Sequence, residues 1–110
     1  MSGKKQIAHS ALLVLSLLSV GDMYGYQMIV ELERRSDKTF QMKEGTLYPV
    51  LKQLENGRYI KSYEQEANGR TRKYYHINES GMQMLKAEAA AWRRYADGID
   101  AVLGGAVVPG

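Results

Sequence analysis

Apolar residues in the first part of the chain recur with the spacing of a helix. Within residues 7–19, Ile7, Ala11, Val14 and Leu18 lie three or four positions apart, and further leucines cover the other side. This pattern predicts a helix. A helix that is apolar nearly all round must be buried on more than one face. In a protein of 110 residues we therefore expect it to contact a second subunit as well as its own core.

A second helix is predicted to run from about Tyr24 to Arg35. Its apolar positions Met28, Ile29 and Leu32 share one helical face, which should point toward the core. A Gly-Asp pair separates this segment from the first helix, and a polar Ser-Asp-Lys turn follows it. Such residues commonly mark the ends of regular elements.

A third helix is predicted within residues 43–55. It carries a helical stripe of Leu47, Val50, Leu51 and Leu54. Proline lacks a backbone N–H and is tolerated in the first turn of a helix. Pro49 therefore places the expected start of the regular helix near Gly45 or Thr46. An Asn-Gly pair follows, and the glycine can adopt the left-handed conformation that ends many helices.

In the third quarter of the chain the apolar residues no longer follow the spacing of a helix. Residues 60–66 and 72–77 are rich in tyrosine and isoleucine, and Asn68-Gly69 lies between them. Asn-Gly between two such runs predicts a β-hairpin. Two tyrosines at 74 and 75 point to opposite faces of a strand, so one of them should pack inward. Asn78 is then a suitable N-cap for the helix that follows.

The last predicted helix covers residues 79–103 and carries a heptad seam. Its apolar positions are spaced alternately by three and four residues over three repeats: Met82, Leu85, Ala89, Trp92, Ala96, Ile99 and Leu103. This alternation favours pairing with another helix, and we expect these residues to form a dimer interface. Packing of one amphipathic helix on its own domain is the alternative. A Gly-Gly pair ends the helix.

The order of elements is three helices, a hairpin and a long helix. Three helices followed by a two-stranded hairpin form a winged helix-turn-helix, in which the third helix enters the major groove and the hairpin, or wing, touches the DNA backbone. The predicted fold is therefore mainly α with a two-stranded β-wing. We expect a winged-helix DNA-binding domain over residues 1–78, a C-terminal dimerisation helix over 79–104 and a flexible tail over 105–110.

The polar side chains of the third helix suit DNA recognition. Thr46, Lys52 and Gln53 lie opposite the leucine stripe and can reach base edges or phosphates. Lys43 and the free N–H groups at the helix start suit a phosphate. The tip of the hairpin carries three cations within four residues, and we expect all three to contact the DNA backbone: Arg70, Arg72 and Lys73.

Three blocks of sequence closely resemble the PadR family of transcriptional regulators. They are YGY at 24–26, EGTLYPVLKQLENG at 44–57 and GRTRKYYHINESG at 69–81. The resemblance extends from Ile7 to about Leu103, and the single C-terminal helix is similar to that of the shorter branch of the family.

The resemblance implies a homodimer that represses transcription from an inverted-repeat operator. It places several side chains on the DNA-facing side: Tyr24, Tyr26, Thr46, Tyr48, Lys52, Arg72 and Lys73. Tyr48 has a second interpretation, which is packing. In small members of this family a tryptophan on the last helix lines a cavity between subunits and stacks flat aromatic effectors. Trp92, flanked by Ala89 and Ala96, would take that role here, and the alternative is that Trp92 only packs.

The distribution of charge along the chain favours a polyanionic partner and indicates which part of the chain would bind it. Residues 1–78 hold 12 Lys and Arg against 8 Asp and Glu, whereas residues 79–110 hold 3 against 4. Binding to DNA should therefore involve the first three quarters of the chain.

Composition also excludes several kinds of site. The absence of cysteine excludes disulfides and thiolate zinc sites and fits a reducing cytoplasm. The two histidines lie far apart in the sequence, so no metal site and no cofactor are expected. Two lysines before the apolar run at 11–20 imitate a signal peptide. That run is too short to span a bilayer, and we expect a buried helix and no membrane partner.

Three other functions fit the sequence less well than DNA binding. An enzyme is not supported by any paired-carboxylate, phosphate-loop or nucleophile motif. A winged helix that binds proteins instead of DNA would tend to expose apolar residues on the third helix and wing, where this sequence places polar and cationic ones. RNA binding is disfavoured because the predicted aromatics do not form a stacking platform.

Overall fold

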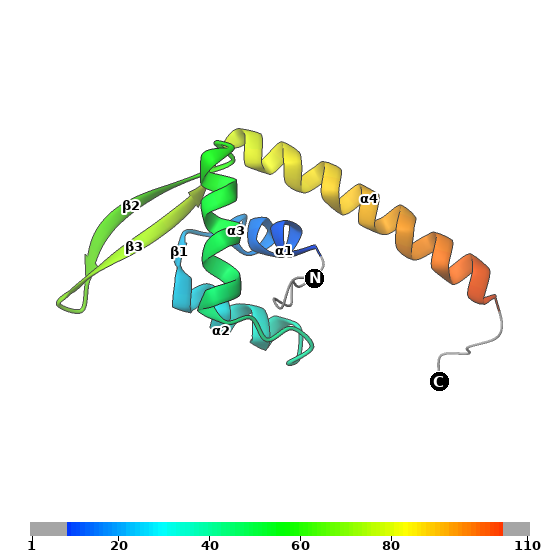
Figure 1. Cartoon of the computed structure of the whole chain (residues 1–110), viewed down its shortest axis with the longest axis horizontal. Helices are drawn as coiled ribbons and strands as arrows, with labels where there is room; N and C mark the ends of the chain where they lie inside the picture. Colours follow the sequence, from blue (N-terminus) through cyan, green and yellow to red (C-terminus); the bar gives the residue numbers. More distant parts are fainter. Residues whose placement is uncertain (1–8, 105–110) are drawn as a thin grey trace.

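The computed structural model describes residues 9–104, which form four helices and one small sheet (Figure 1). In chain order these are α1 (Ser10–Leu18), β1 (Met23–Tyr24), α2 (Gly25–Arg35), α3 (Glu44–Asn56), β2 (Ile60–Ala67), β3 (Arg70–Ile77) and α4 (Glu79–Leu103). The prediction of a mainly helical winged-helix fold with a long C-terminal helix is confirmed. The expected helix start at residue 7 and the expected tail at 105–110 lie outside the described residues.

Helix α1 lies at the centre of the globular head and contacts α2, α3, β3 and α4. Its apolar character explains this position, because a helix that is apolar on several sides must be covered on several sides. The buried side chains of the head form one cluster: Val14, Leu15, Leu17, Leu18, Met23, Met28, Leu32, Met42, Leu47, Leu51, Leu54, Ile60, Tyr75 and Ile77.

The predicted hairpin is confirmed, and a third short strand joins it. β2 and β3 pair antiparallel, and Asn68 and Gly69 form the tight turn with φ of 52° and 75°. Both residues have the positive φ that a two-residue hairpin turn requires. β1 pairs with the other edge of β3, so the strand order is β1-β3-β2. β1 has only two residues, too few to show an alternating pattern.

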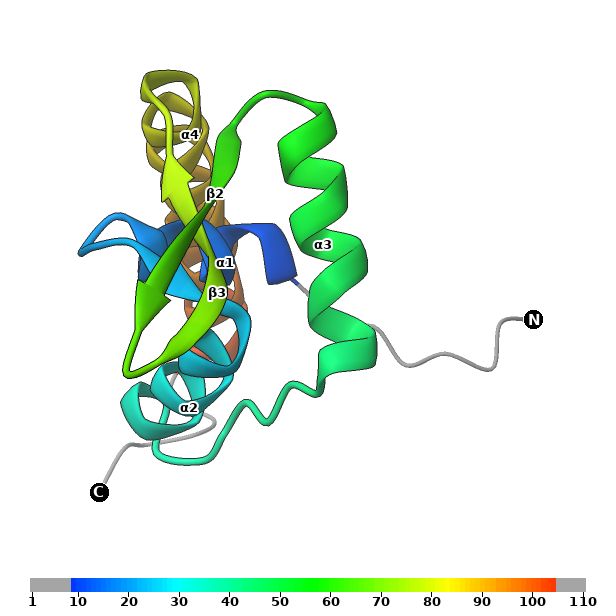
Figure 2. The ribbon, with the colours of Figure 1, turned by 90° about the vertical axis from the view of Figure 1, so that its left-hand side faces the viewer.

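Helix α3 begins earlier than the position of its proline predicted. It starts at Glu44 with Lys43 as the N-cap, one residue before the nearer of the two expected positions, so Pro49 lies in the second turn. Proline leaves the carbonyl of Gly45, four residues earlier, without its usual helical donor. Both residues are exposed, and water can satisfy that carbonyl. Figure 2, seen from the wing side, shows α3 alongside the hairpin with α4 behind.

Helix α4 has the predicted bounds, and Asn78 is its N-cap residue as expected. Asn78 has the extended N-cap conformation, yet its side chain makes no capping hydrogen bond to the helix. Its amide instead donates to the carbonyl of Arg58 at 3.2 Å, and the hydroxyl of Ser80 donates to the same carbonyl at 2.8 Å. The N-cap position is therefore the predicted one, although its side chain is used outside the helix. These contacts join the start of α4 to the turn before β2.

The first turns of α4 pack on the head and the rest projects away from it (Figure 1). Met82, Met84 and Leu85 are partly buried against the core, whereas most residues beyond Glu88 are exposed. The molecule measures 55 × 34 × 27 Å. Its elongated shape comes from this projecting helix.

Candidate nucleic-acid interface

The outer face of α3 carries the polar residues expected to read DNA. Leu47, Leu51 and Leu54 are buried in the head. Lys52 and Gln53 are exposed, whereas Thr46 is half-buried. Since these polar residues alternate with the buried leucines around the helix, one side of α3 holds the core and the other is open.

The first turn of α3 has a mixed electrostatic character. Lys43 is exposed, and no side chain caps the helix at this position. The first N–H groups of a helix lack internal partners and favour an anion. Glu44 occupies the first helical position, and its carboxylate already complements this end of the helix. A phosphate approaching this end of α3 would be attracted by Lys43 and repelled by Glu44.

The cations of the wing lie at the beginning of β3 and point to different faces of the sheet. Successive strand residues alternate between faces, so Arg72 and Lys73 lie on opposite sides. The Arg72 guanidinium lies 4.3 Å from the centre of the Tyr24 ring, and the Lys73 ammonium lies 5.7 Å from that of Tyr75. Tyr75 is the inward-packing tyrosine, with 4% of its surface exposed. Arg70 is exposed beside the turn.

A shallow hollow of about 300 Å³ lies between the start of α2, the start of α3 and the wing. It brings together, from four elements, five residues that the sequence predicted to face DNA, namely Tyr24, Tyr26, Tyr48, Arg72 and Lys73. Glu44 also lines it. Lys43, Thr46, Lys52, Gln53 and Arg70 do not line this hollow.

Tyr48 both packs and remains accessible. A Cβ atom added to Gly25 would lie 2.8 Å from the Tyr48 hydroxyl oxygen, so the ring sits directly over this glycine at the start of α2. Even so, 45% of Tyr48 is exposed. The two interpretations of Tyr48 are therefore compatible, because packing on Gly25 fixes a ring whose edge stays open to solvent.

The outer face of the sheet holds a polar cluster that the sequence analysis missed. The Tyr63 hydroxyl donates to Asp22 Oδ2 at 2.6 Å, and His76 Nδ1 lies 2.9 Å from Asp22 Oδ1. Burial would raise the pKa of the Asp22 carboxyl, but the hydrogen bonds from Tyr63 and His76 and the nearby charge of Lys61 lower it below its ordinary value. The hydrogen bond to Asp22 in turn raises the pKa of Tyr63.

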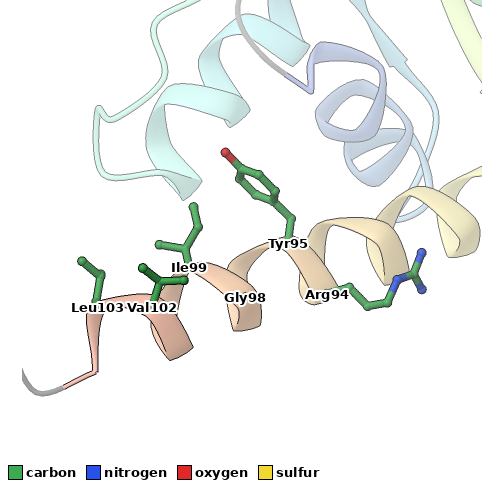
Figure 3. Close-up of a pocket in the computed structure, with 6 residues that line it drawn as sticks. All are labelled: Arg94, Tyr95, Gly98, Ile99, Val102 and Leu103. Atoms are coloured by element: carbon green, nitrogen blue, oxygen red, sulfur yellow. The ribbon is translucent and has the colours of Figure 1, made fainter.

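The projecting part of α4 exposes an apolar face. A hollow of about 390 Å³ follows this face (Figure 3). Tyr95 and Ile99 point from α4 toward the side of α1 and α2 in this view. The hollow is lined by Arg94, Tyr95, Gly98, Ile99, Val102 and Leu103.

The residues of the predicted heptad seam divide into two groups. Met82 and Leu85 are partly buried against the core of their own chain, and Ala96 is half-buried. The remaining positions are exposed: Ala89, Trp92, Ile99 and Leu103.

Trp92 lies where the head ends and the exposed part of α4 begins. Its ring meets the His9 ring edge-on, with centroids 5.2 Å apart, and lies 5.9 Å from the Tyr95 ring. About 38% of Trp92 is exposed. Ala89 and Ala96 flank it one step away on each side, and their small side chains leave its surroundings open.

Other kinds of site are not found in the described part of the chain. Residues 9–104 contain no group of three or more His, Asp or Glu side chains placed to hold a metal ion. Within the same range, no helix combines the length and the apolar character needed to cross a membrane.

Comparison with known proteins identifies relatives of the whole architecture. Residues 14–87 match the model of the transcriptional regulator PadR-like family. A transcriptional regulator from Clostridium thermocellum is 34% identical, with a TM-score of 0.77 over 83% of this chain and 89% of that one. A PadR family transcription regulator from Clostridium difficile is 32% identical, with a TM-score of 0.76 over 88% and 100%. PadR of Bacillus subtilis, solved in complex with operator DNA, shares the fold at 24% identity, with a TM-score of 0.64 over 70% and 44%.

Proposed function

The chain belongs to the PadR-like family of transcriptional regulators, and from this premise we propose that it is a repressor acting as a homodimer on an inverted-repeat operator. Its role is regulatory rather than enzymatic, as in the rest of the family. One observation carries the proposal of sequence-specific binding. The start of α3, through Glu44 and Tyr48, lines one hollow together with the wing cations Arg72 and Lys73. The exposed Lys52 and Gln53 lie further along the same helix.

In this proposal α3 enters the major groove. Lys52 and Gln53 are exposed on its outer face and would hydrogen-bond base edges, with Thr46 offering a methyl and a hydroxyl group. The backbone contacts come from the rim: Tyr24, Tyr26, Lys43, Tyr48, Arg70, Arg72 and Lys73. PadR of Bacillus subtilis, which shares this fold, was solved in complex with operator DNA, and this supports DNA as the partner.

The exposed apolar face of α4 supports the homodimer. Trp92, Tyr95, Ile99 and Leu103 expose between 38% and 59% of their surfaces, and an apolar face of this kind is typical of a protein–protein interface. A second copy of α4 would cover it. A two-fold dimer also explains an inverted repeat, since each subunit reads one half-site about 34 Å from the other.

The test compares the duplex that this protein selects from a random-sequence pool with a scrambled duplex of the same composition. Arg72→Ala and Lys73→Ala should weaken binding to both duplexes and each lower the salt slope by roughly one. Thr46→Ala and Lys52→Ala should instead reduce the preference for the selected duplex, by about 1–3 kcal/mol per lost base contact. Equal affinity of the wild type for both duplexes at physiological salt would overturn the proposal.

We further propose that a planar aromatic effector binds at Trp92 and releases the operator. The partial exposure of this ring and the small residues Ala89 and Ala96 beside it support such a site. Ligand binding between subunits would favour a different dimer geometry and thereby change the distance between the two recognition helices.

A further inference from the structure

We propose that Asp22 is a positioning residue for DNA binding, which holds the wing through Tyr63 and a row of tyrosine rings so that Arg72 faces the DNA backbone. The inference rests on the proposed function, in which Arg72 contacts DNA. Asp22 itself lies in the connection between α1 and β1 and is not among the residues that line the hollow at α3.

Asp22 ties both strands of the hairpin to the head. Its two carboxylate oxygens are used separately, one by Tyr63 of β2 at 2.6 Å and one by His76 of β3 at 2.9 Å. These partners lie 41 and 54 residues away in the sequence. β1 already pairs with β3, whereas β2 forms the outer edge of the sheet and pairs with β3 alone. The bond from Tyr63 therefore gives β2 a further attachment to the head, and the bond from His76 adds to the attachment of β3.

From Tyr63 a continuous series of contacts leads to Arg72. The Tyr63 ring stacks on Tyr74, with centroids 5.8 Å apart and planes 16° from parallel. Tyr74 meets Tyr24 edge-on at 5.4 Å, and the Arg72 guanidinium lies 4.3 Å from the centre of the Tyr24 ring. Offset, edge-on and cation–π geometries are all favourable. The ring of Tyr24 therefore supports the guanidinium, and Asp22 fixes the other end of the row.

Because Asp22 is negatively charged, positioning of Arg72 and simple repulsion of DNA phosphates predict opposite effects when Asp22 is removed. A carboxylate near a DNA-binding surface repels phosphates, so removing it should by itself strengthen binding. The same region carries positive charge from Lys61, which lies opposite His76 across the strands and lines a hollow with Asp22 and Tyr63. If positioning dominates, removal of Asp22 weakens binding in spite of the lost repulsion.

The experiment measures affinity for the selected duplex in the full-length protein. Tyr63→Phe changes no charge and keeps the stacked ring, and it should weaken binding about threefold. Asp22→Ala loses both hydrogen bonds and should weaken binding about tenfold. The matched control is Glu66→Ala, which removes an exposed carboxylate from the same hairpin. This control should leave the affinity unchanged or raise it.

A double-mutant cycle supplies the decisive measurement. Arg72→Ala should cost the wild type about tenfold in affinity but the Asp22→Ala variant less than about threefold, since the guanidinium is already misplaced there. In the Glu66→Ala background Arg72→Ala should keep its full effect. A role of Asp22 in stability alone would lower the unfolding midpoint and leave the effect of Arg72→Ala unchanged.

The outcomes separate this inference from the proposed function. If the wild type binds the selected and scrambled duplexes equally well, or if Arg72→Ala does not change its affinity for DNA, the proposed function on which this inference rests is overturned. Selective wild-type binding that depends on Arg72, together with unaltered or tighter binding by Asp22→Ala and Tyr63→Phe, would overturn the positioning role alone. Additive effects of Asp22→Ala and Arg72→Ala would overturn it as well.

Discussion

At the scale of single residues, the tyrosines of this protein combine packing with an exposed polar edge. Tyr48 rests on Gly25 and still exposes 45% of its surface, and Tyr24 supports Arg72 while capping α2. An aromatic ring has few rotatable bonds and loses little entropy when it is fixed. Tyrosines held in this way can present a hydroxyl at a defined position, which suits a surface that must match the rigid backbone of DNA.

Asp22 is expected to make stability depend on pH in the acid range. Its hydrogen bonds to Tyr63 and His76 outweigh the effect of burial and hold the pKa of its carboxyl below the ordinary 3.8. A lowered pKa stabilises the folded state at higher pH, and this contribution is lost as the pH falls through the folded value. The free energy of unfolding of the wild type should exceed that of Asp22→Asn at about pH 6, and the difference should shrink toward about pH 3.

Urea unfolding of both proteins at one fixed protein concentration gives this difference directly. The other carboxylates titrate in the wild type and the variant alike, so their effect cancels in the comparison. A difference that stays constant across the whole acid range would show that Asp22 does not contribute through its ionised form.

At the scale of whole elements, the start of α4 depends on the absence of a side chain at Gly81. A Cβ atom there would collide with the backbone carbonyl oxygen of Tyr59 and with the Ile77 side chain. Backbone cannot move aside as easily as a flexible side chain, so Gly81→Ala should destabilise the fold by about 1–3 kcal/mol. Gly45→Ala on α3 is the matched control, because a Cβ atom at that position would meet nothing within 4 Å.

Chemical denaturation of the two variants should therefore give opposite results. Alanine has the higher helix propensity, so Gly45→Ala should be neutral or stabilising by up to about 1 kcal/mol. A Gly81→Ala protein as stable as the wild type would mean that the start of α4 can shift away from Tyr59 at little cost.

The two halves of α4 should respond differently to a buried charge. Leu85 is partly buried against the core of its own chain, so Leu85→Asp should destabilise the head itself. Ile99 is 42% exposed on the projecting part of the helix, so Ile99→Asp should leave the head folded and dissociate the proposed homodimer. A chain ending at Glu88 should behave like Ile99→Asp, because it keeps the core contacts of Met82 and Leu85.

Sedimentation at micromolar concentration and the unfolding midpoint separate these effects. We expect Ile99→Asp to be monomeric, with helix content retained and operator affinity largely lost. If Ile99→Asp remains dimeric, the subunits associate through another surface, such as α1.

The sequence alone predicted those helices and strands that are long enough to repeat their pattern of apolar residues several times, or that carry a specific turn motif. The 25 residues of α4 and the Asn-Gly hairpin were predicted because their signals are local and repeated. β1 was missed, since two residues show no period. The start of α3 lies one residue before the expected positions, because an exposed proline is tolerated in the second turn. The cluster at Asp22 joins positions 41 and 54 residues apart, and only the folded chain brings them together.

At the scale of the whole molecule, the DNA-binding head and the exposed face of α4 meet at Trp92. The Trp92 ring contacts that of His9, just before α1, and lies near that of Tyr95, which lines the apolar hollow shown in Figure 3. Helix α1 also contacts α2 and α3. A ligand held at Trp92 would therefore lie beside α1 of the head, where the projecting part of α4 begins.

A planar aromatic compound that stacks on Trp92 should quench its fluorescence and weaken operator binding together. The chain has one tryptophan, so the fluorescence change reports this site alone. Linkage requires that the compound bind more weakly to the operator-bound protein by the same factor by which it weakens operator binding.

Ala89→Leu should fill the space beside the Trp92 ring and lower the affinity for the compound. The unfolding midpoint and the DNA affinity of the ligand-free protein should be retained. The adjacent Arg93 and Arg94 are exposed and favour anionic aromatics over neutral ones of the same shape. If a varied set of such compounds neither quenches Trp92 nor alters operator affinity, Trp92 is a packing residue and any effector binds elsewhere.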